Sequence, residues 1–136
     1  MVFDYERLHV YRKATSFLEL ASALADGFPR KWADTGDQLR RAAMSVALNI
    51  SEGAGESSRG DKVRFYRIAR RSATECAAAI SAASALRIID QKKAKKALSL
   101  LSEICAMLTV LILSPRVGVQ PPPHSAPPAP HPKPTP

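Results

Sequence analysis

The sequence is short of aromatic residues, cysteines and long apolar runs. Aromatic residues make up 6% of the 136 residues, so few side chains are available to stack on nucleic-acid bases. The two cysteines, Cys76 and Cys105, fit no metal-ligand spacing, and we expect them to be buried free thiols. The longest apolar run, residues 104–113, is about half as long as a membrane span.

These shortages argue against several classes of protein. The first residues carry charges and lack the apolar segment of a secretory signal. No metal-ligand set, activated nucleophile or carboxylate pair can be assembled from the sequence, and His124 and His131 are too isolated for a metal site. We therefore expect a cytoplasmic protein that has no membrane segment, cofactor, metal or catalytic activity.

Proline is abundant at one end of the chain and scarce elsewhere. Ten of the eleven prolines lie between Pro115 and Pro136, where large apolar side chains are rare. Such a segment cannot bury enough surface to offset the entropy of ordering. We expect residues 1–113 to form one domain and residues 114–136 to form a disordered tail, either a solubilising extension or a ligand for a proline-recognition module.

Apolar residues recur at helical spacing in four segments, and no segment shows the alternation of a strand. The first helix is expected to end at residues 27–29, and the others to cover residues 35–52, 61–88 and 91–113. Short connections between them predict an all-α, up-down-up-down antiparallel four-helix bundle. Thr35 and Gln38 form a capping-box pattern at the second helix, and Asp90 is expected to cap the fourth.

The apolar stripes of these helices predict the core, as the first and third show. The stripe of the first helix is Tyr5, Leu8, Tyr11, Thr15, Leu18, Ala21 and Ala25. The stripe of the third helix is Phe65, Ala69, Ser72, Cys76, Ile80 and Ala83. The third helix is rich in alanine and serine, so it allows close helix approach but supplies little apolar area.

Polar residues interrupt the apolar face of the second helix, which has the sequence QLRRAAMSVALNISEG. Asn49 lies on the apolar stripe, and its amide needs a hydrogen-bonding partner on another helix. Arg41 and Glu75 lie level if the second and third helices are antiparallel, so we expect them to form an ion pair. The predicted structural polar cluster is Gln38, Arg41, Ser45, Asn49, Glu52, Ser72 and Glu75. The alternative, a catalytic carboxylate, lacks a second catalytic group.

The end of the fourth helix, MLTVLIL, is apolar on nearly all sides and must be covered on more than one side. We expect an oligomer interface there, made of Met107, Leu108, Leu111 and Ile112. The alternative is that the first helix and the tail cover this end.

The chain is basic, with twenty Lys and Arg residues against twelve Asp and Glu and a formal charge of +8. Such a charge favours an anionic partner. One basic cluster lies along the third helix and a second at the start of the fourth. The predicted nucleic-acid-binding residues are Arg59, Lys62, Arg64, Arg67, Arg70, Arg71, Lys92, Lys93, Lys95 and Lys96. Tyr66 is the one aromatic candidate for base stacking.

The chain resembles the four-helix-bundle family first recognised in intervening sequences of bacterial 23S ribosomal RNA genes. It is similar, more distantly, to the accessory variability protein of diversity-generating retroelements. The matching residues are 8–14, 38–53, Phe65, Ile68, Ala69, Ser72 and Glu75. Ser51 stands where the family usually has Ala, and Arg71 where it usually has Gly. The second departure adds a positive charge.

This resemblance implies a homopentameric bundle without known catalytic activity. In the retroelement relatives it implies binding to nucleic acid and to a reverse transcriptase. Together with the basic clusters, it predicts a non-enzymatic oligomer that binds RNA or DNA through the phosphate backbone. The alternative is a protein-interaction scaffold that does not bind nucleic acid directly.

Overall fold

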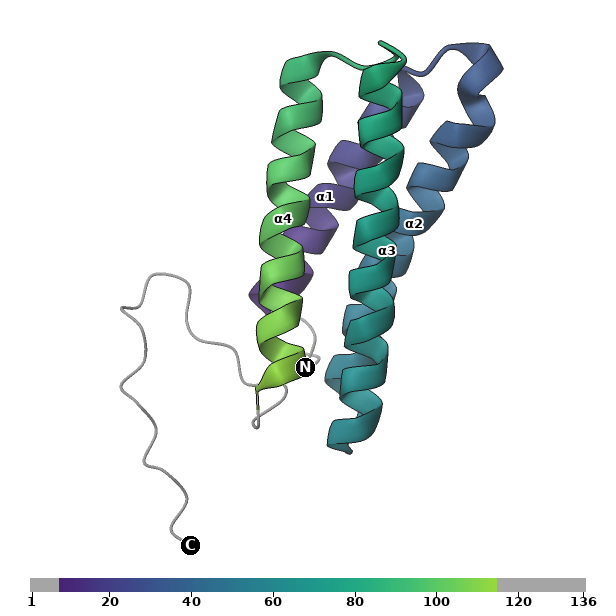
Figure 1. The fold of residues 1–136 in the computed structure, drawn as a ribbon. Coiled ribbons are helices and arrows are strands. Elements are labelled where there is room, and N and C mark those ends of the chain that lie inside the picture. Colours follow the sequence, from purple (N-terminus) through teal and green to yellow (C-terminus); the bar gives the residue numbers. More distant parts are fainter. Residues whose placement is uncertain (1–7, 115–136) are drawn as a thin grey trace, which may run out of the picture.

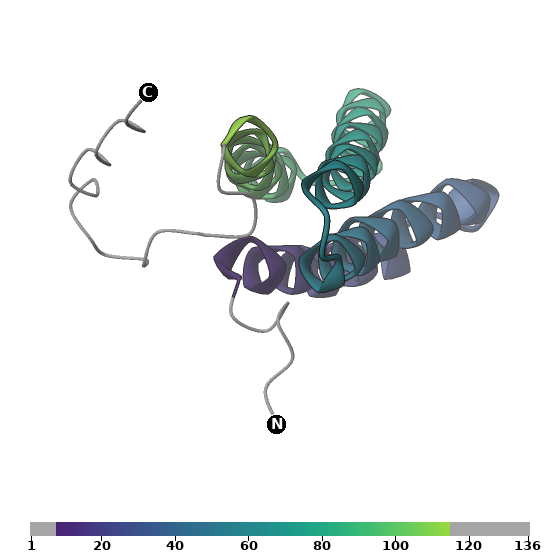
Figure 2. The ribbon, with the colours of Figure 1, turned by 90° about the horizontal axis from the view of Figure 1, so that it is seen from below.

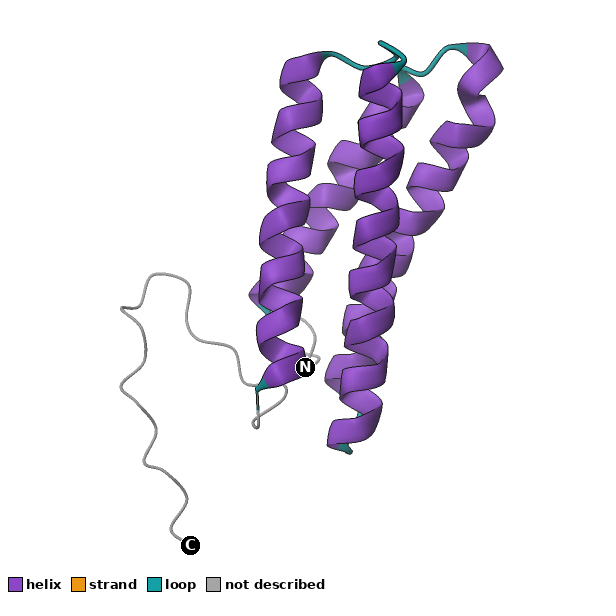
Figure 3. Cartoon of the chain, in the orientation of Figure 1, coloured by secondary structure: helices purple, strands orange, loops and turns teal. Residues whose placement is uncertain are grey.

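The computed structural model describes residues 8–114, which form four α-helices and one short 3-10 helix. The elements are α1 (His9–Asp26), η2 (Arg30–Trp32), α2 (Ala33–Gly55), α3 (Arg59–Ala85) and α4 (Gln91–Leu113), and no strand occurs in this part of the chain (Figure 1, Figure 3). Consecutive helices run in opposite directions, which confirms the predicted up-down-up-down bundle. The predicted tail, apart from Ser114, lies outside the described residues.

The four helices form two layers. Seen along the bundle, α1 and α2 lie on one side and α3 and α4 on the other (Figure 2). Each helix packs on the next one along the chain, and α4 returns to pack on α1. The contact between α2 and α3 is the most extensive of these, so the position of α3 depends mainly on α2.

The helix starts differ from those predicted. Helix α2 begins at Ala33, directly after the 3-10 turn, so Thr35 lies inside the helix and the predicted capping box is wrong. Asp90 does occupy the N-cap position of α4, but its side chain makes no capping hydrogen bond. The side-chain cap that does form is at α3, where Ser58 Oγ accepts a hydrogen bond of 3.1 Å from the Asp61 amide.

The apolar stripe of α1 is shifted from the predicted one, and that of α3 differs at its first residue. On α3 the buried residues are Tyr66, Ala69, Ser72, Ala73, Cys76, Ile80 and Ala83, and Phe65 is only half-buried. On α1 they are Val10, Ala14, Phe17, Ala21, Leu24 and Ala25. Tyr11 and Leu18 are half-buried at the edge of the core, and Tyr5 lies outside the described residues. Both observed stripes keep the predicted spacing of three and four. The phase was correct on α3, apart from its first residue, and was wrong on most of α1.

One close contact joins α2 to α3. The Tyr66 side chain is fully buried and its ring lies against Gly53. A Cβ at residue 53 would come within 2.7 Å of Tyr66 Cε1. Gly53 is therefore required by the close approach of the two helices, and the ring fills the space that a side chain would otherwise take.

We expect Gly53→Ala to lower the free energy of unfolding by about 2 kcal/mol, because the added methyl group must displace the buried Tyr66 ring. Gly55→Ala is the matched control, since a Cβ there meets nothing within 4 Å. Urea unfolding of both variants measures the difference. Equal stabilities would show that α2 and α3 do not approach as closely as described.

The Tyr66 hydroxyl is buried and has no hydrogen-bond partner among residues 8–114. Burial raises the pKa of Tyr66 from 10.0 to about 12, because the phenolate would lose its hydration. The ring therefore contributes its apolar area to the core, while its hydroxyl contributes an unfavourable desolvation term.

We expect Tyr66→Phe to keep or raise stability at neutral pH, by up to about 1 kcal/mol, because the hydroxyl is not hydrogen-bonded. Above pH 10 the unfolded state of the wild type ionises while the folded state stays neutral, so its stability falls as pH rises. The phenylalanine variant lacks this term and should lose about 1 kcal/mol less by pH 11. Denaturation at pH 7, 9 and 11 measures both effects. A loss of more than 1 kcal/mol at pH 7 would mean that the hydroxyl has a partner.

Helix α4 is, among the described residues, the one helix long and apolar enough to cross a membrane by length and composition. The apolar run of residues 104–113 is only about half as long as a membrane span, so this result was not predicted from the sequence. Its fully buried residues, among them Leu101, Ile104 and Leu108, face the other helices of the bundle. 33% of its apolar window is buried in the bundle, so α4 packs on the other helices along one face.

Candidate nucleic-acid interface

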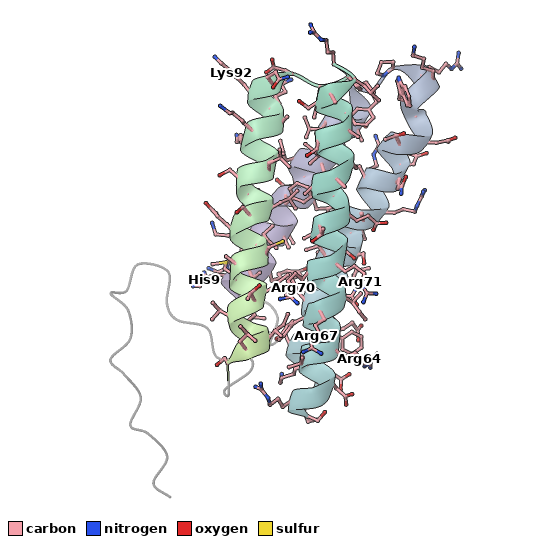
Figure 4. All side chains as sticks on the ribbon, in the orientation of Figure 1. His9, Arg64, Arg67, Arg70, Arg71 and Lys92 are labelled. Atoms are coloured by element: carbon pink, nitrogen blue, oxygen red, sulfur yellow. The ribbon has the colours of Figure 1, made fainter. Side chains whose placement is uncertain are left out.

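Three arginines form a row along the outer side of α3. Arg64, Arg67 and Arg71 are exposed, and they lie at the spacing of three and four residues that places side chains on one helix face. Successive members are about 4.5 and 6 Å apart along the helix axis. Figure 4 shows them on the half of α3 that is nearer its start. We call Arg64, Arg67 and Arg71 the arginine row.

The members of the arginine row have few contacts within the chain. Arg64 stacks over the ring of Phe65, with its Cζ atom 4.4 Å from the ring centroid, and its Nε lies 4.0 Å from Asp61 Oδ1. Arg67 and Arg71 have no ion pair or side-chain hydrogen bond with any of residues 8–114. Their guanidinium groups are thus available to an external anion.

Three other predicted binding residues instead hold helices together. Lys62 Nζ donates hydrogen bonds to the carbonyls of Gly53 at 3.2 Å and Ala54 at 3.0 Å, in the last turn of α2. The Gly53 carbonyl also accepts from the Glu56 amide. Arg59 donates to the carbonyl of Ser114, and to that of Ile112 at 3.4 Å, at the end of α4.

Arg70 has a similar structural role. It is half-buried, and its Nη1 donates a hydrogen bond of 3.1 Å to Thr109 Oγ1, which in turn donates to the Cys105 carbonyl at 2.8 Å. Arg70 therefore links α3 to α4 and differs from the arginine row.

The four predicted lysines lie elsewhere. Lys92, Lys93, Lys95 and Lys96 are exposed in the first turns of α4. Figure 4 shows Lys92 at the opposite end of the bundle from the arginine row. Thr109, the contact of Arg70, is about 25 Å further along α4 than Lys92. The two basic clusters are therefore separate surfaces.

The aromatic residue predicted to stack on bases is not accessible. Tyr66 is fully buried in the core, so this prediction is wrong. Phe65, half-buried beneath Arg64, is the aromatic residue in contact with the arginine row. Any binding there depends on charge and shape more than on stacking.

The predicted polar cluster forms in part. Ser45 Oγ on α2 and Ser72 Oγ on α3 lie 2.8 Å apart and share a hydrogen bond. Asn49 Nδ2 donates to the Ser45 carbonyl at 2.8 Å and to Ser45 Oγ at 3.1 Å. Asn49 therefore finds its acceptors on its own helix and not, as predicted, on another. The Ser45–Ser72 hydrogen bond places residues 45 and 72 at the same height along the bundle axis.

The predicted ion pair of Arg41 and Glu75 does not form. Both residues are exposed, and none of the ion pairs among residues 8–114 joins them. Gln38 and Glu52 are exposed as well. The residues lie on the outer sides of their helices, because the phase of the α3 stripe turns Glu75 away from α2. The buried pair was predicted because the two residues lie at the same height along antiparallel helices. This prediction was wrong, because it did not consider which way each side chain faces.

The predicted oligomer interface is mostly part of the chain's own core. Leu108, Leu111 and Ile112 are buried by the other helices, and Met107 is half-buried. The exposed apolar residues at this end of α4 are Val110 and Leu113. Assembly through Leu108, Leu111 and Ile112 is thus ruled out for this fold, and the homopentamer itself stays a prediction.

Both cysteines have the properties expected of free thiols in a helix interface. Cys76 is buried and Cys105 half-buried. Burial raises the pKa of Cys76 from 9.0 to about 12, and burial also raises the pKa of Cys105. Within residues 8–114 no group of three His, Cys, Asp or Glu side chains could hold a metal ion. The absence of a cofactor stays a prediction.

Sequence reasoning missed two features that position the interface. The Ser58 cap fixes the start of α3 two residues before the predicted start, and the spacing of Ser58 to Asp61 is a capping signal visible in the sequence. The carbonyl contacts of Lys62 and Arg59 have no such signal, because they depend on where the ends of α2 and α4 lie.

The chain is similar to a known protein family and to solved structures. The model of the 23S rRNA-intervening sequence protein family matches residues 6–110. A crystal structure of a protein of unknown function from Bacteroides thetaiotaomicron, described as a member of the S23 ribosomal protein family, superimposes with a TM-score of 0.72 at 20% identity. The match covers 77% of this chain and 96% of that one, and shows the shared fold. No curated protein sequence matches the chain.

Proposed function

Because the chain belongs to the 23S rRNA-intervening sequence protein family, we propose that it is a non-enzymatic protein that binds RNA through phosphate contacts of its arginine row. The observation that carries this proposal is the exposure of Arg64, Arg67 and Arg71 on one face of α3, where Arg67 and Arg71 have no acidic partner among residues 8–114. Guanidinium groups bind phosphate oxygens in a bidentate manner.

The arrangement of the row favours contact with a phosphate backbone over reading of bases. The arginines project from a straight helix at intervals of about 4.5 and 6 Å. The accessible aromatic surface beside them is limited to half-buried Phe65. Binding should therefore depend on salt and hardly on sequence. The name of the family connects it with 23S rRNA, which makes ribosomal RNA the first nucleic acid to test.

We expect the charge reversal Arg67→Glu with Arg71→Glu to weaken binding of a 23S rRNA fragment by at least about a hundredfold at low salt. The slope of log affinity against log salt should fall by about 1.5, as for the loss of two phosphate contacts. Fluorescence anisotropy at several salt concentrations measures both quantities. Circular dichroism should be unchanged, because both residues are exposed.

The matched control is Lys92→Glu with Lys96→Glu, which changes the net charge by the same amount at the other end of the bundle. This variant should lose much less affinity than the arginine variant. Equal losses would show that only net charge matters and that the arginine row is not the site. A wild-type protein that binds no RNA at low salt would contradict the proposed function as a whole.

A further inference from the structure

A second basic surface lies at the other end of the bundle from the arginine row. It surrounds the connection from α3 to α4 (Figure 1). Lys92, Lys95 and Lys96 lie at the spacing of three and four residues that places side chains on one face of α4. Lys93 and Arg87 are exposed beside them. We call Arg87, Lys92, Lys93, Lys95 and Lys96 the distal basic cluster.

The charges of the distal basic cluster are unpaired within the described chain. None of the five side chains takes part in an ion pair or a hydrogen bond with any of residues 8–114. Residues 87–96 carry five positive charges against the single negative charge of Asp90. The lysines also lie in the first turns of α4, at the positive end of the helix dipole, which is unfavourable for the fold. A bound anion would relieve this repulsion.

Arg87 has a backbone conformation that favours glycine. Its φ is 59°, and it is the one non-glycine residue with a positive φ among residues 8–114. It follows the end of α3, where the Arg87 amide donates to the Ser84 carbonyl at 3.0 Å and the Ile88 amide to the Ala83 carbonyl at 2.9 Å. Glycine is the usual residue at such a helix end. An arginine there is unfavourable for the backbone, which favours a binding role for its side chain.

The surface between the two basic groups offers no cation to a phosphate backbone. Residues 72–85 of α3 and 97–113 of α4 include no Lys or Arg, and their charged residues are Glu75 and Glu103. Lys13 of α1 approaches this surface, but it is paired with Glu103 at 2.7 Å. The arginine row and the distal basic cluster are about 25 Å apart along the bundle (Figure 4). A backbone bound by one group is therefore not led to the other.

We propose that the distal basic cluster binds a second RNA segment, so that one chain bridges two RNA segments, one at each end of the bundle. This inference rests on the proposed binding of RNA by the arginine row. Phosphate oxygens are the recognised groups at both ends. Lysine binds phosphate as a point charge, whereas arginine binds it in a bidentate manner. The segment at the distal basic cluster is thus the more weakly bound of the two.

Energy transfer between two RNA hairpins, one labelled with a donor and the other with an acceptor, tests the proposal. The wild type should bring the hairpins together at low salt, and added salt should separate them. Lys92→Glu with Lys96→Glu should still bind one hairpin, but its energy transfer should be at least about tenfold lower. Arg67→Glu with Arg71→Glu should lose the energy transfer as well, because a bridge needs both ends.

The matched control is Arg12→Glu with Arg41→Glu. It changes the net charge by the same amount at exposed residues of α1 and α2, outside both basic groups. This variant should bridge the hairpins like wild type.

Arg87→Gly separates binding from folding. Glycine adopts a φ of 59° without a steric penalty, so the melting temperature should rise. Energy transfer should fall, because one cation of the distal basic cluster is lost. A fall in both quantities would be an effect on folding and would count against the proposal.

The outcomes distinguish this proposal from the proposed function. A wild type that binds RNA without energy transfer overturns the bridge and leaves binding by the arginine row intact, whereas a wild type that binds no RNA overturns both. Energy transfer that survives Lys92→Glu with Lys96→Glu also overturns the bridge, because the second segment is then bound elsewhere. Binding of the distal basic cluster to vesicles of anionic lipid, without bridging of RNA, would overturn it too.

Discussion

The close approach of α2 to α3 is the constraint on which the other surfaces of this bundle depend. The Tyr66 ring lies where a side chain at residue 53 would be, so only glycine permits this distance. The Ser45–Ser72 hydrogen bond of 2.8 Å lies further along the same contact and fixes its register. Small residues thus allow α2 and α3 to pack closely, whereas α4 packs through large apolar residues.

This contact determines which side chains face solvent. Once Tyr66, Ala69 and Ala73 face the core, the helical period turns Arg67 and Arg71 outward. On α2 the same constraint turns Arg41 and Glu52 outward. The arginine row carries charge of one sign, which suits a polyanion.

The sequence predicted the number, order and direction of the helices, because apolar periodicity and short connections determine them. It predicted the α3 stripe from Ala69 to Ala83 but not the aromatic residue at its start. Phe65 and Tyr66 are adjacent aromatic residues, and only the position of Gly53 shows which of them is buried. The wrong Arg41–Glu75 pair has another origin: it was predicted from the level of the two residues in antiparallel helices, and level does not show that both side chains are exposed. The structural contacts of Lys62 and Arg59 depend on helix ends that periodicity does not specify.

The central claim is that the Gly53–Tyr66 and Ser45–Ser72 contacts hold α2 and α3 as one rigid unit. Native-state hydrogen exchange tests it most directly, because it reports the free energy of opening of each amide. The claim predicts that the amides of residues 45–53 and 66–73 exchange only through global unfolding, with one shared opening free energy. Exchange of these amides at an opening free energy well below the global value would contradict it.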